Sequence, residues 1–417
     1  MTTNNYVDTL AKNTRKAAKQ LRSKNIESRN LALKKLAELL RADIANIIEA
    51  NQKDLTAAKE MNLSEAMVDR LTLTEERIES IATAVDEIRA FPDPLGKELS
   101  SLKREDGLII SRKSVAIGSI LFIYESRPNV TIDGAALCLK SGNAVILRGG
   151  KESAFSSAKF IELVYKALNF ANIDTGAVQL VNTADRAVVQ ELLKRDDALH
   201  LVIPRGGEGL IRSVSENSRI PVIKHYKGVC HVYIDQSADL KKALEVSLNA
   251  KTHRTGVCNA TETLLIDQNL PEETIIQLVS NLAKQGVEIR GDEEICKLIT
   301  NATLASLEDW DTEYLDMIIS VKLVEGVSGA TDHIDEHGSG HTEAIIAQDK
   351  EVLGFFENNV DSSSVMLNAS TRFADGGEYG LGAEVGISTD RLHARGPMGV
   401  ESLTTYKWIV KGDGHIR

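Results

Sequence analysis

Apolar residues recur at helical spacing through the first 90 residues of the chain. In residues 27–50 they fall three and four positions apart, at Leu33, Leu36, Leu40, Ile44 and Ile47. This spacing places them on one face of an amphipathic helix. Residues 75–91 repeat the pattern until PDPLG interrupts it. The N-terminal region is therefore predicted to be helical.

The pattern changes to two extended runs at residues 96–117. They flank Glu105, Asp106 and Gly107, and an Asp-Gly pair favours the tight turn of a β-hairpin. We predict a hairpin here, and an exposed hairpin of this kind often pairs with another subunit.

Strand-like and helix-like runs alternate between residues 115 and 250. The strand-like runs are VAIGSILFIY, NAVILRGG, AVQLVN, LHLVIPRGG and CHVYID. Strict alternation predicts a parallel sheet with helices on its faces and ligands beyond the carboxyl ends of the strands. A second alternating region follows from about 250 to 380, a glycine-rich segment occupies 380–399, and a final strand is expected near the C-terminus.

Two of these strand ends carry a glycine pair followed by a helix, RGGKES at 148–153 and PRGGEGL at 204–210. Backbone N–H groups at such a helix start can receive phosphate. Neither segment is a Walker A loop or a G-x-G-x-x-G motif. Each glycine pair could therefore either allow a tight turn or bind phosphate, and the two alternatives are equally favoured.

Composition narrows the class of protein. The chain has 417 residues, 42% of them hydrophobic, enough for two or three domains, and a net charge of −11 without long basic runs. We therefore expect no binding to nucleic acid or to anionic membrane. The N-terminus lacks an apolar signal region, and no apolar stretch of about 18 residues occurs. A cytoplasmic location is therefore the default expectation.

The four cysteines are widely spaced, which argues against a zinc site or a disulfide framework. Cys138 and Cys296 lie in apolar helical patterns and are predicted core residues. Cys230 precedes His231 directly, but successive side chains of a strand point to opposite faces. The two are therefore not expected to form a dyad.

Cys258 lies in KTHRTGVCNATETLLI, between a basic approach and a strand. Lys251, His253 and Arg254 precede it, and nearby positive charge stabilises a thiolate. A core position and a nucleophile are equally compatible with these residues alone.

His333, His337 and His341 stand four residues apart. Helical spacing would make a metal face, but Gly338 and Gly340 interrupt the helix. We expect a loop role or a plain turn, and no metal site.

Longer motifs carry a resemblance along nearly the whole chain. The chain resembles the gamma-glutamyl phosphate reductase family, within the aldehyde dehydrogenase superfamily, in the following motifs: YESRPNVT, LKSGNAVILRGGKE, LVIPRGGEGL, VCHVYID, VCNATETLLI, EHGSGHTEAI, VDSSSVMLNASTRFADGGEYGLGAE and LHARGPMGVESLTTYKW. One departure is Thr255, where many relatives have proline.

The resemblance implies an α/β aldehyde dehydrogenase-like fold in three parts. A Rossmann-type cofactor-binding domain with N-terminal helices would comprise residues 1–95 and 118–245. An α/β catalytic domain would comprise 246–385. A β-hairpin oligomerisation element would comprise 96–117 and 400–417.

The implied reaction is the NADPH-dependent reduction of L-glutamate 5-phosphate to L-glutamate 5-semialdehyde, with release of phosphate, in proline biosynthesis. Cys258 would be the nucleophile that forms a thioester, because an acyl group on sulfur is a good electrophile. Asn129 aligns with the superfamily's oxyanion asparagine, acting with the Cys258 N–H. Residues 222–230, where hydrolytic relatives carry a glutamate base, contain no carboxylate, so the thioester should survive attack by water.

The same resemblance implies the cofactor contacts. Arg148, with Lys151 near it, would meet the 2′-phosphate of NADPH. The helix start at Gly206 and Gly207 would face the pyrophosphate. Glu313 would bind the nicotinamide ribose.

A loop at residues 368–377 is the expected substrate site. Ser370, Thr371 and Arg372 are polar and suit an amino acid, and Arg372 can bind the α-carboxylate in a bidentate manner. Arg127 and Arg254 are the alternatives for that contact.

The resemblance also implies binding partners, and two other functions remain as alternatives. The implied partners are L-glutamate 5-phosphate, further copies of the chain, and, as an open question, glutamate 5-kinase. A hydrolytic or CoA-acylating aldehyde dehydrogenase, and a scaffold that only docks the kinase, are the alternative functions.

Overall fold

The protein is described by a computed structural model that covers residues 2–224, 226–381 and 384–417. Contacts within the chain divide it into two compact units. Unit 1 comprises Met1–Lys224, Gly380–Gly386 and Met398–Arg417, and unit 2 comprises His225–Tyr379 and Ile387–Pro397. Among the described residues, no helix combines the length and the apolar character needed to cross a membrane.

The N-terminal part of unit 1 is helical, as the apolar spacing predicted. Its helices are α1 (Thr3–Leu21), α2 (Ile26–Ala42), α3 (Ile44–Glu60), α4 (Glu65–Leu71) and α5 (Glu75–Ala90). Side chains of Thr2, Asn25, Ser64 and Thr74 cap four of them by accepting a backbone N–H of the first turn. The expected long helix through 27–50 breaks at Asp43, which ends α2 and starts α3.

A four-stranded parallel sheet forms the centre of unit 1, in the order β5-β4-β3-β6. The strands are β3 (Ser119–Tyr124), β4 (Ala144–Arg148), β5 (Val178–Leu180) and β6 (Leu201–Arg205). The helices between and after them are α6 (Val130–Lys140), α7 (Ala154–Phe170), α8 (Arg186–Leu192) and α9 (Glu208–Asn217). Every residue of β3 is buried, as a central strand covered on both faces requires.

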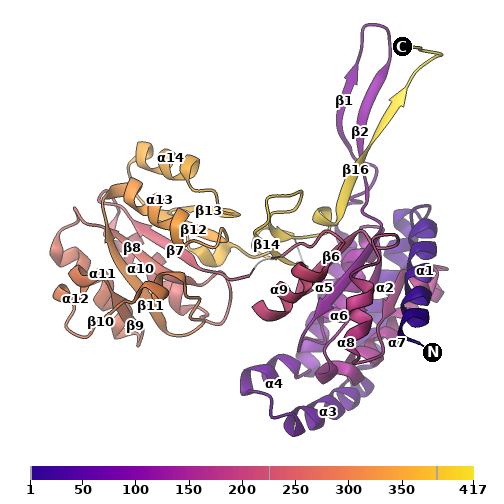
Figure 1. The fold of residues 1–417 in the computed structure, drawn as a ribbon, viewed down its shortest axis with the longest axis horizontal. Helices are drawn as coiled ribbons and strands as arrows, with labels where there is room; N and C mark the ends of the chain where they lie inside the picture. The colour runs from indigo at the N-terminus through magenta and orange to yellow at the C-terminus, as the bar shows by residue number, and fades with distance from the viewer. Residues whose placement is uncertain (1, 225, 382–383) are drawn as a thin grey trace. The chain divides into compact units, whose positions relative to one another are not determined.

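The predicted hairpin is present and gains a third strand. β1 (Glu98–Lys103) pairs with β2 (Ile109–Ala116), and β16 (Thr404–Lys411) pairs with the other edge of β2, both antiparallel. Figure 1 shows this three-stranded sheet extending away from the body of unit 1. It exposes large apolar side chains, at Leu99, Leu102, Tyr406, Trp408 and Val410.

One predicted strand proves to be two. The run VAIGSILFIY spans the end of β2 and all of β3, which belong to different sheets. Gly118 separates them with φ +131°, a backbone conformation that side-chain-bearing residues rarely adopt. A Cβ at this position would also lie 2.9 Å from the His200 ring.

Unit 2 is built on a seven-stranded parallel sheet in the order β10-β9-β11-β8-β7-β12-β13. Its strands are β7 (Cys230–Ile234), β8 (Thr261–Asp267), β9 (Glu288–Gly291), β10 (Thr303–Leu304), β11 (Ile318–Val324), β12 (Thr342–Ile346) and β13 (Ser364–Leu367). Its helices are α10 (Leu240–Thr252), α11 (Glu272–Lys284), α12 (Glu293–Leu298), α13 (Gly326–His337) and α14 (Lys350–Asn359).

The observed division of the chain falls earlier than the expected end of the cofactor domain at residue 245. β7 lies between β8 and β12 in the second sheet, and the first and longest segment of unit 1 ends at Lys224. The alternation of strands and helices continues without interruption across this point, so the sequence pattern alone does not mark it.

Short elements complete the fold. Two strands, β14 (Gly386–Ser388) and β15 (Gly396–Met398), pair within the glycine-rich segment. Single-turn helices are η1 (Lys151–Ser153), η2 (Thr175–Ala177), η3 (Leu307–Asp311), η4 (Thr371–Phe373) and η5 (Glu401–Leu403).

Candidate active site

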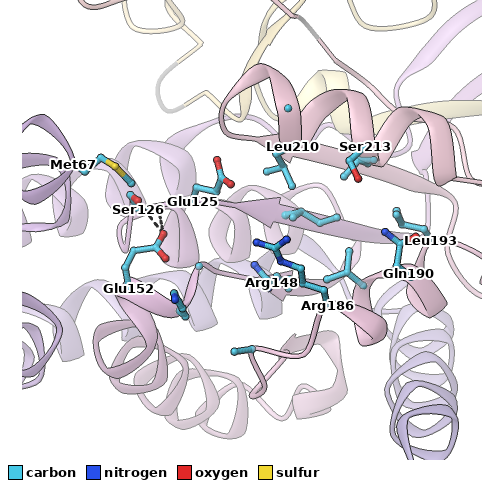
Figure 2. Close-up of a pocket in the computed structure, with 17 residues that line it drawn as sticks. Met67, Glu125, Ser126, Arg148, Glu152, Arg186, Gln190, Leu193, Leu210 and Ser213 are labelled. Atoms are coloured by element: carbon cyan, nitrogen blue, oxygen red, sulfur yellow. Dashed lines mark hydrogen bonds between the residues drawn. The ribbon is translucent and has the colours of Figure 1, made fainter. Parts of the chain in front are cut away.

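Unit 1 contains a cavity of about 730 Å³ at the carboxyl ends of its strands. Figure 2 shows side chains from β4, α8 and α9 around it. Arg148, Lys151 and Arg186 bring three cationic side chains to its wall, with Glu125 and Glu152 also lining it. The position matches the general rule for parallel sheets, in which ligands bind beyond the carboxyl ends of the strands.

Arg148 ends β4 and presents an unused donor. Within the described part of the chain, its buried Nε atom has no hydrogen-bond partner. An unsatisfied buried donor is costly, so the cavity suits an anionic group that accepts from this guanidinium. Lys151 is exposed on η1, directly after the glycine pair. Arg186, at the start of α8, was not identified from the sequence.

The glycine pair after β4 has a packing reason. A Cβ on Gly149 would lie 3.1 Å from the Tyr124 ring, and one on Gly150 would lie 2.0 Å from the Glu152 carboxylate. Glu152 in turn accepts from the backbone N–H of Ser126 at 2.6 Å and from its hydroxyl at 2.9 Å. Ser126 has φ +45°, so this carboxylate holds a disfavoured turn in place.

The second glycine pair meets a carboxylate. The N–H of Gly207 donates to Glu125 Oε2 at 3.1 Å, and a Cβ on Gly206 would lie 2.3 Å from the same oxygen. Gly206 and Gly207 are not among the cavity-lining residues, whereas Gly209 of α9 is. The helix start therefore does accept an anion, here one supplied by the chain itself.

Asn129 stands immediately before α6, in unit 1. Its Nδ2 donates to Asp133 Oδ2 at 2.9 Å, so the amide is oriented by the helix that follows it. Burial raises the pKa of Asp133 to about 6.

Cys258 lies in unit 2, in the loop between α10 and β8, as the sequence predicted. Its side chain is partly exposed. The loop is closed by hydrogen bonds from Val257 N to Thr255 O and from Ala260 N to Val257 O, at 2.9 and 3.1 Å. Lys251 does not lie free beside the thiol, because it is fully buried against Glu262.

Strand β7 and the residues just before it contact the backbone of the Cys258 loop. Cys230 Sγ donates to the Cys258 carbonyl at 3.2 Å and contacts His341 Nδ1 at 3.6 Å. Gly228 passes so close that a Cβ there would lie 2.0 Å from the Cys258 oxygen. His231 faces away and binds Glu343 at 2.8 Å, as the alternation of a strand predicted.

The expected substrate loop is joined to the Cys258 loop. Thr371 donates to the Asn259 carbonyl at 2.7 Å, and Asn259 Nδ2 donates to the Ala374 carbonyl at 3.0 Å. Asn259 follows the candidate nucleophile directly. The two loops therefore form one hydrogen-bonded piece.

Arg372 is the cationic member of this loop. It is half-buried, and its Nε donates to His253 Nδ1 at 3.4 Å. Burial lowers the pKa of Arg372, while the Asp375 carboxylate acts in the opposite direction. The Ser370 hydroxyl accepts from the Arg372 N–H, and Thr371 is fully buried; the substrate contact expected of these two residues stays a prediction.

Glu313 lies in unit 2, in the segment between η3 and β11. The next residue, Tyr314, donates to Asp309 Oδ1 at 2.8 Å and contacts the Ser320 hydroxyl at 2.8 Å. The segment is therefore held by side chains on both flanking elements.

Cys138, Cys296 and His333 differ in their burial. Cys138 is fully buried, and burial raises its pKa, whereas Cys296 is only partly buried, contrary to its predicted core position. His333 packs against His231 and Trp310, and burial lowers its pKa to about 2. In the described ranges, no group of three or more potential ligands is arranged for a metal ion.

Comparison with known proteins shows the family to which the chain belongs. A model described as "Aldehyde dehydrogenase family" matches residues 1–317. The chain therefore belongs to the aldehyde dehydrogenase family, the class that its two parallel-sheet units and its loop cysteine define.

Relatives within that family carry a more particular name. A gamma-glutamyl phosphate reductase of Desulfotalea psychrophila is 49% identical over 401 residues, covering 96% of each chain. The crystal structure of gamma-glutamyl phosphate reductase from Thermotoga maritima is 43% identical, with a TM-score of 0.97 over 99% of each chain. These similarities confirm the resemblance that the sequence motifs indicated.

A more distant structure shares the fold alone. The glyceraldehyde-3-phosphate dehydrogenase of Methanocaldococcus jannaschii, solved in complex with NADP, is 14% identical with a TM-score of 0.68, covering 98% of this chain and 94% of its own.

Proposed function

We propose that the protein reduces L-glutamate 5-phosphate to L-glutamate 5-semialdehyde with NADPH, releasing phosphate, as a step of proline biosynthesis. The observation that carries this proposal is the joining of the Cys258 loop to the loop of Arg372 through Asn259. This arrangement ties the loop that carries a thiol to the loop that carries a guanidinium, which suits a substrate with both an electrophilic acyl carbon and a carboxylate. The name shared by the relatives at 43 to 49% identity supports the same substrate.

Cys258 is the nucleophile in this proposal. Its thiolate attacks the acyl carbon of the glutamyl phosphate, the bond from that carbon to the phosphate oxygen breaks, and phosphate leaves with the electron pair. Phosphate is a stable anion, so no strong general acid is needed. Asn129 Nδ2 and the Cys258 N–H would donate to the developing oxyanion. Asp133 orients the Asn129 amide so that nitrogen serves as the donor.

The proposed cofactor contacts follow the family resemblance, residue by residue. Arg148, Lys151 and the additional cation Arg186 suit the 2′-phosphate that distinguishes NADPH from NADH. Glu313 would bind the nicotinamide ribose. When bound, NADPH supplies the hydride that converts the thioester to the aldehyde and frees the Cys258 thiolate.

Water should be a poor competitor for the thioester. Residues 222–230 contain no carboxylate. The carboxylates of Glu343 in β12 and Glu262 in β8 are already bound to other side chains. Glu343 accepts from both the N–H and the ring of His231 at 2.8 Å, and Glu262 is bound to Lys251. A base must reach water to activate it, and both of these side chains are fully buried.

The reverse reaction tests cofactor, substrate and acyl acceptor together. Oxidation of glutamate 5-semialdehyde with NADP⁺ should require phosphate, or arsenate in its place, and should yield little free glutamate without it. Rapid oxidation without phosphate would reveal a hydrolytic enzyme, and a requirement for coenzyme A would reveal an acylating one. Absence of any NADP⁺ reduction would favour a scaffold.

Assembly through the three-stranded sheet is part of the proposal. Its exposed apolar side chains, with Arg112 stacked 4.8 Å from the Tyr406 ring centre, suit contact with another copy of the chain. Glutamate 5-kinase, which makes the unstable substrate, is proposed as a further partner. Sedimentation of the enzyme alone and with the kinase would test both.

A further inference from the structure

A buried ion pair closes the base of the loop that carries Cys258. Lys251 lies in the last turn of α10, and Glu262 is the second residue of β8. Lys251 Nζ and Glu262 Oε2 are 2.5 Å apart, and neither side chain is exposed to solvent. Because Cys258 lies between these two positions, the pair holds both ends of its loop together.

The same carboxylate reaches a second segment. Glu262 Oε1 accepts the backbone N–H of Leu315 at 3.3 Å. Leu315 has φ +54°, a left-handed conformation that leucine disfavours and that needs support from its surroundings. Glu313, the proposed ribose contact, lies two residues earlier. One side chain therefore connects the nucleophile loop to the proposed cofactor segment.

Stability alone does not account for this pair. Removing two charges from water costs free energy that their attraction only partly restores, so an apolar pair of similar size commonly stabilises a fold as well or better. Tyr314 is already anchored by Asp309 and Ser320. What an apolar pair could not supply is an acceptor for the Leu315 N–H.

We infer that Glu262 is a positioning residue that sets the Cys258 loop and the Glu313 segment in fixed relation to each other. Its two carboxylate oxygens have different partners. Oε2 binds Lys251 across the base of the Cys258 loop, and Oε1 accepts the Leu315 N–H beside Glu313. The inference rests on the proposed function, because it takes Cys258 as the nucleophile and Glu313 as a cofactor contact.

Two double variants isolate the Leu315 hydrogen bond. Lys251→Met with Glu262→Gln, and Lys251→Met with Glu262→Leu, both remove the charges in balance, so neither leaves an unpaired buried ion. Only glutamine keeps a carbonyl oxygen that can accept from Leu315. Should the leucine variant fail to fold, Glu262→Met takes its place as the second apolar partner.

Hydrogen exchange measured by mass spectrometry gives the direct readout. Residues 312–317 should exchange faster in the leucine variant than in the glutamine variant. Dissociation constants for NADPH, from its fluorescence, should be about threefold to tenfold higher in the leucine variant, as loss of one hydrogen bond predicts. Equal exchange in the two variants would overturn the inference.

A Glu313→Gln variant separates the two proposals. If it weakens NADPH binding while the two double variants bind alike, Glu262 does not position the segment. If Glu313→Gln binds NADPH as the wild type does, the ribose contact proposed for Glu313 is wrong, and the exchange rates alone decide the role of Glu262. Full activity in Cys258→Ala would refute the proposed function itself.

Discussion

Substitution of Gly228 by alanine should displace the proposed nucleophile, Cys258, while leaving its thiol group in place. Gly228 is buried just before β7, and a Cβ there would lie 2.0 Å from the Cys258 carbonyl oxygen and 2.7 Å from its Cα. These are backbone atoms, which cannot rotate aside as the end of a long side chain could. The Cys258 loop, or the segment before β7, must therefore move.

The expected cost follows from the overlap. Forcing one extra carbon into a packed site costs about 1 to 3 kcal/mol, which lowers Tm by about 2 to 12 °C for a unit of this size. Displacement of a reacting group by about 1 Å can reduce turnover about 100-fold. We therefore expect Gly228→Ala to lose at least about tenfold in kcat, with only a modest loss of folding stability.

Thermal unfolding, kcat and the rate of Cys258 alkylation by iodoacetamide measure these effects. Gly354→Ala is the matched control in unit 2, because Gly354 lies within α14 with no atom near its added carbon. That change should raise stability by about 0.5 to 1 kcal/mol and leave kcat unaltered. A Gly228→Ala enzyme with wild-type Tm, kcat and alkylation rate would refute the close approach of this segment to Cys258.

Three further predictions concern the proposed site. Cys258→Ala should abolish turnover and leave NADPH binding intact, as shown by fluorescence titration, whereas Cys138→Ala should keep most activity. Labelling by iodoacetamide that spares Cys258 in an inactivated enzyme would contradict this. Arg148→Ala should weaken NADPH by about 1 to 3 kcal/mol more than NADH, and equal losses in titrations of both cofactors would exclude a 2′-phosphate contact. Arg372→Lys should raise KM for glutamate semialdehyde about tenfold or more through loss of a bidentate contact, with KM for NADP⁺ little changed. If neither KM moves, the carboxylate is bound elsewhere.

Local patterns predicted most of the fold's elements. Apolar spacing located the N-terminal helices, and alternation located both parallel sheets, because these signals depend on residues close together in the chain. The sequence did not predict which sheet each strand joins. β2 and β3 read as one strand across Gly118, and β7 joins the second sheet although nothing in its own sequence distinguishes it from β6.

Some of the candidate site residues were predicted from the sequence, and others were missed. Cys258 stands at the loop before β8 that its neighbours predicted. Gly228 and Glu262 were missed, since their importance arises from contacts with residues 30 and 53 positions away, Cys258 and Leu315. Arg186 was missed because α8 brings it to the cavity from a separate crossover. A buried lysine followed by a buried glutamate in the next strand is a signal that only the folded chain reveals.

The hydrogen bonds around Asn259 constrain how this enzyme could change its substrate. Thr371 and Ala374 hold the loop of Arg372 against the residue that follows Cys258. A substitution that reshapes the Arg372 loop must therefore also move the backbone of the Cys258 loop. Specificity should be easier to alter through the Arg372 side chain than through Ser370 or Thr371, whose hydroxyls take part in hydrogen bonds within these two loops.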